Sequence, residues 1–175
     1  MRPILTLMGA QKRWIDWPGA ALVTAATLGA LVIGGLISPD GEDPWYRNLR
    51  KAPLNPPDIA FAIVWPVLFA LMLAGALMVL KEAGTFKRAS AALGLYFTML
   101  AANVCWSLFF FGFRDPPVAL GILVALWLLI GTMMLRFALH SPRAALLQAP
   151  YLAWVTFAGY LNIYVCLFNP DAGAG

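Results

Sequence analysis

Five long apolar stretches, none of which contains Asp, Glu, Lys, Arg or His, make up about two-thirds of the chain. They cover residues 17–39, 59–80, 89–113, 116–135 and 144–170. A helix needs about 20 apolar residues to cross a hydrocarbon core of about 30 Å, and each stretch is this long. Five such helices in 175 residues leave too little polar chain to cover them in water. The pattern therefore predicts an all-α integral membrane protein, a five-transmembrane-helix bundle that forms one domain over residues 1–175.

Composition supports this class: 62% of the residues are hydrophobic, 11% are charged, and the mean hydropathy is +0.78. A transmembrane β-barrel is excluded because its strands alternate in polarity, whereas these stretches are apolar on every face. The two cysteines, Cys105 and Cys166, lie inside apolar stretches and form no CxxC pair. We interpret them as small buried apolar residues, and the sequence predicts no metal site.

Charge is concentrated at the ends of the apolar stretches. The net charge of +4 comes from scattered basic pairs, so it does not indicate a nucleic-acid partner. The N-terminal tail and the second and fourth loops hold eight Lys and Arg residues, whereas the first and third loops and the C-terminus hold four. The positive-inside rule then predicts a cytoplasmic N-terminus, with the first loop and the C-terminus on the opposite side.

The first loop, residues 40–58 (loop 1), is far longer than the other three. Long loops in compact proteins are usually functional or disordered. Trp45 and Tyr46 give this loop aromatic groups to bury, and three prolines stiffen it. We interpret it as a long ordered loop that caps one end of the bundle between the first and second helices, with a plain linker as the alternative.

Aromatic and polar residues inside the apolar stretches recur on single helix faces. They are Trp65 and Phe69 in the second stretch, Asn103, Trp106 and Phe110 in the third, and Trp154, Ala158, Leu161 and Asn162 in the fifth. When the chain is threaded through a membrane, these positions fall in its middle or in the half on the side of loop 1. The sequence therefore predicts an aromatic-lined cavity beneath that loop.

Each of these residues also has a purely structural interpretation. Asn103 and Asn162 are alternatively hydrogen-bonding groups that join helices. Trp106 and Trp154 lie too deep for the interfacial aromatic belt, so core packing is their alternative. Trp127, in the fourth stretch, has no polar companion there and is expected to face lipid or core.

The first stretch carries a ladder of small residues at helical spacing, Ala26, Ala30 and Gly34. Small residues allow transmembrane helices to approach closely, either within the bundle or between protomers. No apolar stretch carries a charge, which argues against a proton pump or an ion-coupled carrier. The one histidine, His140, lies in the fourth loop, on the wrong side to ligate a haem in the predicted cavity.

Taken in order, these motifs resemble the translocator protein family (TspO/MBR, the tryptophan-rich sensory proteins or peripheral benzodiazepine receptors) over about residues 45–169. The matching motifs are Trp45-Tyr46-x-x-Leu49-x-Lys51, Pro56-Pro57, Phe61, Val64-Trp65, Asn103-x-x-Trp106-Ser107-x-x-Phe110, Pro150-Tyr151-Leu152-x-Trp154-Val155-x-Phe157-Ala158-x-x-Leu161-Asn162 and Phe168-Asn169. One such motif would be weak in so apolar a chain, but their common order is specific.

The resemblance implies a homodimer that binds porphyrins, such as protoporphyrin IX or haem, and benzodiazepine-type ligands under loop 1, with no required cofactor. Carried over by position, the ligand-binding candidates are Tyr46, Pro56, Pro57, Trp65, Asn103, Trp106, Trp154 and Ala158, beside Phe69, Phe110 and Asn162 from the helix faces. Flat aromatic faces suit a macrocycle. Asn103 could bond a ligand carbonyl, and Arg50 or Lys51 at the rim could meet propionates.

Some positions depart from the family pattern. Ala52 stands where proline usually follows the lysine, Ile59 replaces a tryptophan, Ile63 a proline, Phe69 an aromatic hydroxyl and Met99 a glutamine. The last two changes remove hydrogen-bonding groups, so ligand preference is expected to differ. No Lys or Arg follows Tyr164, and this absence of a cholesterol-recognition pattern lowers the expectation of sterol binding.

Three functions stay open at this point. The first is a membrane-embedded sensor or regulator that binds tetrapyrroles. The second, also implied by the resemblance, is an enzyme for light- and oxygen-dependent porphyrin breakdown, with Tyr46, Trp65 and Trp154 as redox-active candidates. The third is a passive carrier of porphyrin or membrane lipid, since no intramembrane charge is present to drive transport.

Overall fold

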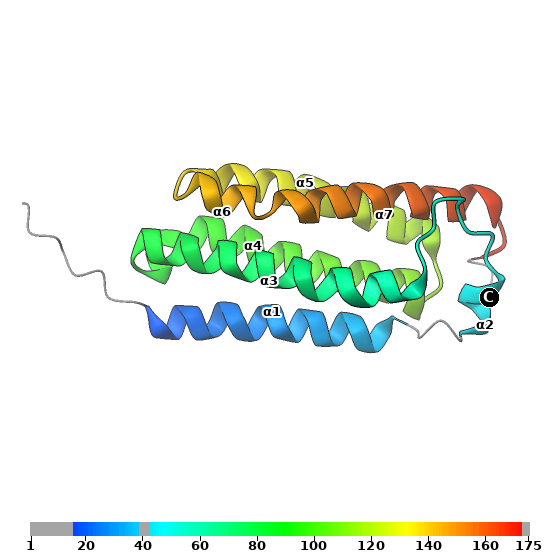
Figure 1. Ribbon diagram of the computed structural model, residues 1–175, viewed down its shortest axis with the longest axis horizontal. Coiled ribbons are helices and arrows are strands. Elements are labelled where there is room, and N and C mark those ends of the chain that lie inside the picture. Colours follow the sequence, from blue (N-terminus) through cyan, green and yellow to red (C-terminus); the bar gives the residue numbers. More distant parts are fainter. Residues whose placement is uncertain (1–15, 39–42, 173–175) are drawn as a thin grey trace, which may run out of the picture.

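The computed structural model describes residues 16–38 and 43–172, and every regular element in these residues is helical. Figure 1 shows a bundle whose long helices run roughly parallel to one axis. They are α1 (Trp17–Ile37), α3 (Asp58–Ala83), α4 (Phe86–Ser107), α5 (Pro116–Ala138) and α7 (Ala149–Phe168), with the short helices α2 (Pro44–Asn48) and α6 (Pro142–Leu146) between them. The π-helical turn η1 (Leu108–Gly112) extends α4.

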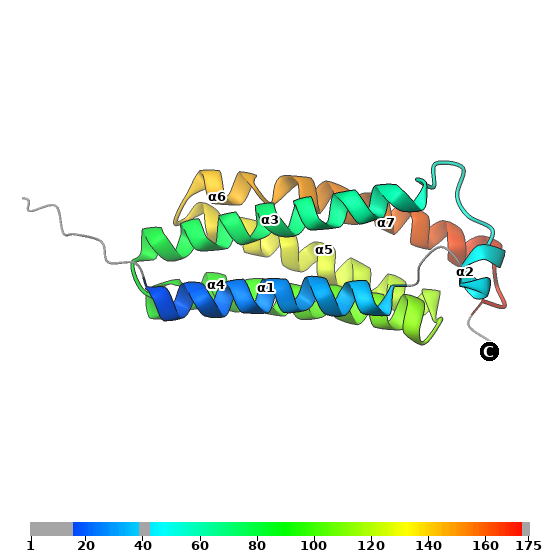
Figure 2. The same cartoon turned by 60° about the horizontal axis from the view of Figure 1, so that its bottom comes forward.

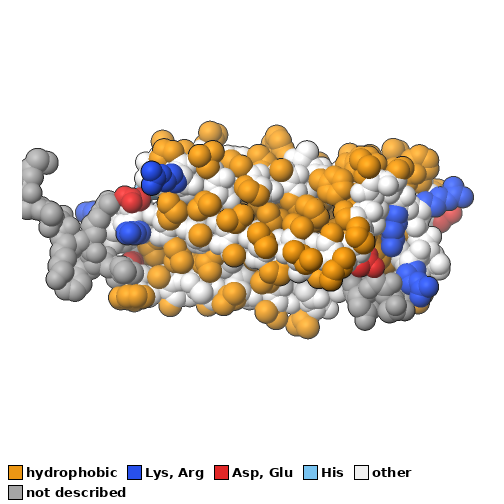
Figure 3. Space-filling model, in the orientation of Figure 1, with side chains coloured by type: hydrophobic (Ala, Val, Ile, Leu, Met, Phe, Trp, Pro, Cys, Tyr) orange, Lys and Arg blue, Asp and Glu red, His pale blue; other side chains and the backbone are white. Residues whose placement is uncertain are grey.

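The predicted five-helix membrane bundle is confirmed: five helical segments are long and apolar enough to span a membrane. Hydrophobic side chains cover the length of the visible face, whereas Lys, Arg, Asp and Glu gather near its two ends (Figure 3). This distribution is expected of a surface in contact with lipid, because a charge within the hydrocarbon core is costly. The protein is an integral, multi-pass membrane protein.

The last predicted span, 144–170, is present, but it is interrupted by a turn near its start. The chain forms α6, turns at Leu147 and Gln148, and begins α7 at Ala149. Pro150 explains the break, because it has no N–H for the carbonyl of Leu146 and its ring would collide with that carbonyl. The third span also ends differently from a plain helix, since the N–H of Phe113 bonds the carbonyl of Leu108 five residues earlier, at 2.8 Å.

The helix starts on the side away from loop 1 are tied together by Asp16. Its carboxylate accepts hydrogen bonds from the N–H of Gly19, at 2.9 Å, and from that of Phe86, at 2.6 Å. Asp16 thus caps α1 and links it to the start of α4. The two backbone N–H groups stabilise the ionised form and lower the pKa of the Asp16 carboxyl.

The half of the bundle near Asp16 is densely packed. Tyr96, Phe137, Met72 and Met133 are fully buried there, and the rings of Tyr96 and Phe137 stack with centroids 6.2 Å apart. α4 contacts α1, α3 and α5, and α7 packs on α5; Figure 2 shows α1 and α4 side by side. The well-packed core therefore lies away from loop 1.

The small-residue ladder of the first span packs inside the bundle. Ala30 is buried, and a Cβ added at Gly34 would lie 3.9 Å from the Oγ of Ser107 in α4. The ladder therefore brings α1 close to α4. Within one chain, Ala30 and Gly34 therefore serve helix packing inside the bundle.

Loop 1 is ordered over residues 43–57, as predicted; residues 39–42, with the end of the predicted first span and the start of the loop, lie outside the described residues. Asp43 caps α2 by accepting a hydrogen bond from the N–H of Tyr46, at 2.9 Å. The ring of Trp45 packs against Phe110 at 5.9 Å, and its Nε1 donates to the carbonyl of Ala172 at 3.2 Å. Figures 1 and 2 show α2 beside the C-terminal end of α7. These contacts are those of a folded cap and not of a linker.

Candidate functional site

A cavity of about 660 Å³ lies beneath loop 1, between α1, α3, α4 and α7. Most of the predicted site residues line it, and they come from four segments of the chain: loop 1, α3, α4 with η1, and α7. They are Tyr46, Lys51, Trp65, Phe69, Asn103, Trp106, Phe110, Trp154, Ala158 and Asn162. The helix-face argument therefore placed these side chains around a common space.

Three predicted residues, Arg50, Pro56 and Pro57, do not line the cavity. Pro57 precedes the first residue of α3, and the carbonyl of Pro56 accepts a hydrogen bond from Asn55 Nδ2 at 3.0 Å. Arg50 is exposed, and its backbone is bonded to Asn169. These residues shape the cap over the cavity and do not form its wall.

The walls also contain residues that the helix-face argument did not find. α1 and its C-cap contribute Ala30, Leu31, Gly34, Gly35 and Ser38; loop 1 adds Ala52 and Asn55; and the other helices add Asp58, Ile59, Phe61, Ala62, Pro66, Ser107, Phe111 and Val165. Leu161, which was on the predicted face of the last span, lines the cavity as well. The small residues of α1 were the available signal, because a stripe without bulky side chains leaves space as readily as it allows close packing.

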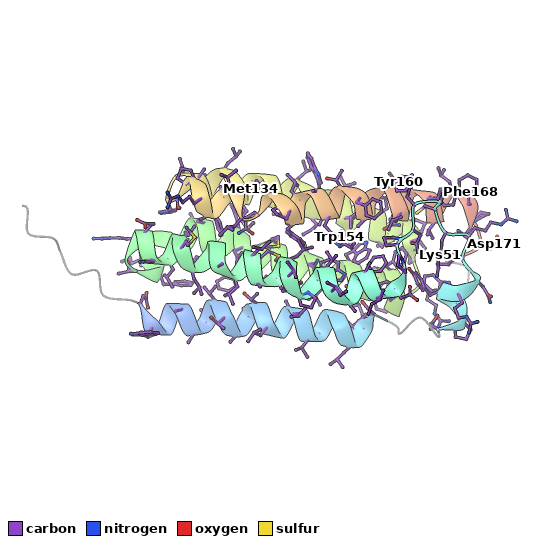
Figure 4. All side chains as sticks on the ribbon, in the orientation of Figure 1. Lys51, Met134, Trp154, Tyr160, Phe168 and Asp171 are labelled. Atoms are coloured by element: carbon purple, nitrogen blue, oxygen red, sulfur yellow. The ribbon has the colours of Figure 1, made fainter. Side chains whose placement is uncertain are left out.

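The deep wall of the cavity is a cluster of aromatic rings. Trp65 of α3 and Trp154 of α7 meet edge to face, with centroids 6.4 Å apart and planes at 85°. Phe61 packs on Trp154 at 5.6 Å, and Phe69 and Tyr151 pack on Trp65 at 6.1 and 6.4 Å. Figure 4 shows Trp154 between α3 and α7, with Lys51 nearer the capped end. Trp65 and Trp154 are only half-buried, which leaves ring surface for a ligand.

The two buried asparagines join helices. Asn103 of α4 donates from Nδ2 to the hydroxyl of Tyr151 in α7, at 2.9 Å. Asn162 of α7 donates to the carbonyl of Pro116 at 2.9 Å and accepts from Trp106 Nε1 at 3.2 Å. The structural interpretation thus holds for both residues, which also line the cavity. Asn162 fixes the ring of Trp106 through this bond.

The mouth of the cavity carries one cation and one anion among its described lining residues, Lys51 and Asp58. Lys51 Nζ lies 3.8 Å from the ring centroid of Tyr46, a cation–π contact. Burial, and then the negative charge of Asp58, raise the pKa of the Tyr46 hydroxyl, which the hydrogen bond with Asn55 partly offsets. Tyr46 is therefore a neutral O–H group at physiological pH, next to a positive charge.

One residue outside the cavity, Trp127, finds its polar partner on another helix. Its Nε1 donates to Thr156 Oγ1 of α7 at 2.9 Å. The sequence of α5 could not reveal this partner, since it belongs to the neighbouring helix. Trp127 is 43% exposed, on the lipid-facing surface as one interpretation had it.

Comparison with known proteins now identifies the family. The model of the TspO/MBR family matches residues 20–167. The chain is 36% identical to the tryptophan-rich protein TspO of Chlorobaculum tepidum over 86% of this chain and 95% of that protein. It is 33% identical to the tryptophan-rich sensory protein of Cereibacter sphaeroides over 91% and 99% of the two chains, and 35% identical to the human translocator protein over 91% and 92%. The match extends over nearly the whole bundle that encloses the cavity, and the chain belongs to the TspO/MBR family.

Proposed function

We propose that this protein is a membrane-embedded receptor that binds porphyrins, protoporphyrin IX or haem, and benzodiazepine-type ligands in the cavity under loop 1. Ligand binding would make it a sensor or regulator of tetrapyrrole levels or of a stress response. The observation that carries the proposal is the capped cavity of about 660 Å³ with Trp65, Trp106 and Trp154 in its walls. This volume is in the range of about 300–1,000 Å³ typical of ligand pockets.

The chemistry of the walls supports a flat apolar ligand with an anionic edge. Indole and phenyl rings offer surfaces on which a macrocycle can stack. Lys51, at the mouth, can meet one propionate of a porphyrin, and the neutral hydroxyl of Tyr46 lies on the same rim. Arg50, the other cation considered, lies outside the lining, so we assign the propionate contact to Lys51.

Quenching of tryptophan fluorescence by protoporphyrin IX in the dark tests the proposal. Titration of the purified protein in detergent is expected to show saturable quenching. Trp65→Ala and Trp154→Ala are expected to weaken the apparent affinity about tenfold, since stacking on one aromatic ring contributes about 1–3 kcal/mol for nucleic-acid bases of comparable flatness. Trp127→Phe is the matched control because Trp127 lies outside the cavity. Equal affinity in all four proteins would overturn the proposed site.

A second candidate function, oxidation of the bound porphyrin by dioxygen under light, is favoured by one feature. Trp65 and Trp154 are in edge contact at 6.4 Å within the cavity wall, so two oxidisable rings lie beside the proposed ligand. Loss of the porphyrin Soret band under illumination, compared between the wild type and Trp154→Phe, measures this activity. Loss no faster than in detergent without protein would exclude it. A passive carrier is tested instead by porphyrin release from proteoliposomes.

We further propose a homodimer, and a membrane orientation with the N-terminus in the cytoplasm and loop 1 outside. Light scattering of the purified protein in detergent measures the oligomeric state. For orientation, Lys81→Cys and Arg50→Cys are made separately in a chain whose two native cysteines are replaced by alanine. A membrane-impermeant maleimide applied to intact cells is expected to label the Arg50→Cys protein alone.

A further inference from the structure

Pro66 lies inside α3, which continues without interruption from Asp58 to Ala83. In a regular helix the N–H of residue 66 would bond the carbonyl of residue 62. Proline has no N–H, so the carbonyl oxygen of Ala62 loses its donor within the helix. A backbone acceptor that has lost its regular helical donor is thus placed at a defined point of a membrane-spanning helix.

Such a carbonyl is costly where it faces lipid tails, because no water is available there to bond it. It is tolerated where it lines a cavity or meets a donor from a neighbouring helix. Ala62 and Pro66 both line the cavity, so the cavity is an environment in which this acceptor can be satisfied.

The geometry places the acceptor on the cavity wall. Ala62 and Pro66 both line the cavity, as do Asp58 and Phe69 of the same helix face. Residues four apart lie one above the other on a helix. The carbonyl that would have joined residues 62 and 66 consequently lies between two lining residues, and Trp65, which directly precedes Pro66 in the chain, lines the same cavity.

We propose that the Ala62 carbonyl oxygen is a binding subsite that accepts a hydrogen bond from an N–H group at the edge of a ligand stacked near Trp65. The class of ligand that it favours is flat and apolar, with a secondary lactam or another outward-facing N–H. This inference rests on the proposed function, since it assigns one polar contact within the same cavity.

The test compares two benzodiazepines that differ at one nitrogen. Nordazepam carries a lactam N–H, whereas diazepam carries an N-methyl group and cannot donate. Their dissociation constants are measured by displacement of protoporphyrin IX from the wild type and from Pro66→Ala. The substitution supplies the missing backbone N–H, which bonds Ala62 within the helix and removes the acceptor.

The wild type is expected to bind nordazepam more tightly than diazepam. The ratio compared is the dissociation constant of diazepam divided by that of nordazepam. In Pro66→Ala this ratio is expected to fall about three- to tenfold, the effect of one hydrogen bond. Comparing ratios cancels the size of the methyl group and any general change in the cavity. Val67→Ala is the matched control, because Val67 is exposed, lies outside the lining and leaves Pro66 in place. The control is expected to keep the wild-type ratio.

Pro66→Val supplies the same N–H with a different side chain and serves if Pro66→Ala does not yield folded protein. An unchanged ratio in folded Pro66→Ala or Pro66→Val would overturn the subsite. So would failure of the wild type to bind either compound while protoporphyrin IX still binds. Failure of protoporphyrin IX itself to quench the wild type would instead contradict the proposed function.

Discussion

The side-chain amide of Asn169 forms two hydrogen bonds with the backbone of Arg50. Asn169 Oδ1 accepts from the N–H of Arg50 at 2.8 Å, and Asn169 Nδ2 donates to the carbonyl of Arg50 at 3.1 Å. The side-chain amide thus satisfies both backbone groups of Arg50, as the backbone of a neighbouring β-strand would. Asn169 is the residue that follows α7, so these bonds join loop 1 to the end of that helix. A second tie holds the start of the same loop, where Asp43 and Arg114 form an ion pair at 3.2 Å.

Asn169→Ala is expected to loosen the cap and to speed dissociation of protoporphyrin IX about tenfold. Two backbone bonds are lost, and each contributes about 0.5–1.5 kcal/mol. Stopped-flow recovery of tryptophan fluorescence after displacement measures the rate. Asn169→Asp retains the acceptor for the Arg50 N–H but loses the donor, so its rate is expected to be intermediate. Equal rates in the three proteins would show that the cap does not limit dissociation.

Asp16 makes the stability of the bundle vary with pH in the acidic range. Its carboxyl has a lowered pKa in the folded protein because Gly19 and Phe86 donate to it. The stabilisation is fully present above the unfolded value of about 3.9 and is lost as the pH falls through the lower folded value. Between about pH 6 and pH 3, Tm is expected to fall more in the wild type than in Asp16→Asn. Parallel Tm curves would contradict this role.

Thr27 and Tyr96 join α1 and α4 by a buried hydrogen bond of 2.7 Å between their hydroxyls. Removing one hydroxyl is expected to cost more stability than removing the other. In Tyr96→Phe, Thr27 keeps its bond to the carbonyl of Val23, at 2.7 Å, so the loss is expected to be about 0.6 kcal/mol. In Thr27→Val the Tyr96 hydroxyl is left buried and unpaired, which costs about 1–3 kcal/mol. Unfolding in a denaturing detergent measures both. The reverse order would contradict the assigned roles.

Gly75 is required by the close approach of α3 to the α6–α7 turn. A Cβ at this position would collide with Gln148 Nε2 and lie 2.9 Å from the carbonyl oxygen of Ala144. Gly75→Ala is therefore expected to destabilise the protein by about 1–3 kcal/mol, measured as a lower Tm. Gly94→Ala is the control, since no atom lies within 4 Å of an added Cβ there, and alanine favours the helix. A Tm for Gly75→Ala equal to that of the control would contradict the clash.

The same turn offers a stabilising change. Gln148 is fully buried, and within the described part of the chain its Oε1 has no hydrogen-bond partner. Gln148→Met replaces this amide with an apolar group of similar length and removes an unpaired polar atom. Tm is expected to rise by a few degrees, with ligand affinity unchanged because the residue lies outside the cavity lining. A lower Tm would show that the hydrogen bond from Gln148 Nε2 to the carbonyl of Ala144, at 3.4 Å, contributes more than the unpaired oxygen costs.

Properties that depend on one segment at a time could be predicted from the sequence. The five spans follow from the length of the apolar stretches, and the cavity follows from residues such as Trp65, Asn103 and Trp154 that share a helix face. Properties set by a neighbour could not be predicted in this way. The bond from Trp127 to Thr156 and that from Asn169 to loop 1 each join residues of different segments.

Two further differences arise from local chemistry that was present in the sequence. Pro150 near the start of the last apolar stretch excludes a continuous helix, yet the unbroken hydropathy of 144–170 concealed it. Gly34 and Gly35 were interpreted as a packing surface, whereas they also line the cavity. A small side chain permits either contact or empty space, and only the positions of α3 and α4 decide between the two.

One half of the bundle is densely packed and the other contains the cavity, so substitutions in the two halves are expected to have different effects. Tyr96 and Phe137 are fully buried in the half remote from loop 1. The other half, called here the hollow half because it contains the cavity, is lined by aromatic rings such as Trp65 and Trp154 that are only half-buried. Substitutions in the half that contains the cavity change the shape of the cavity wall. They leave the densely packed half, which stabilises the fold, largely unchanged. Substitutions among the rings of the hollow half are therefore expected to change the proposed ligand preference with little loss of stability.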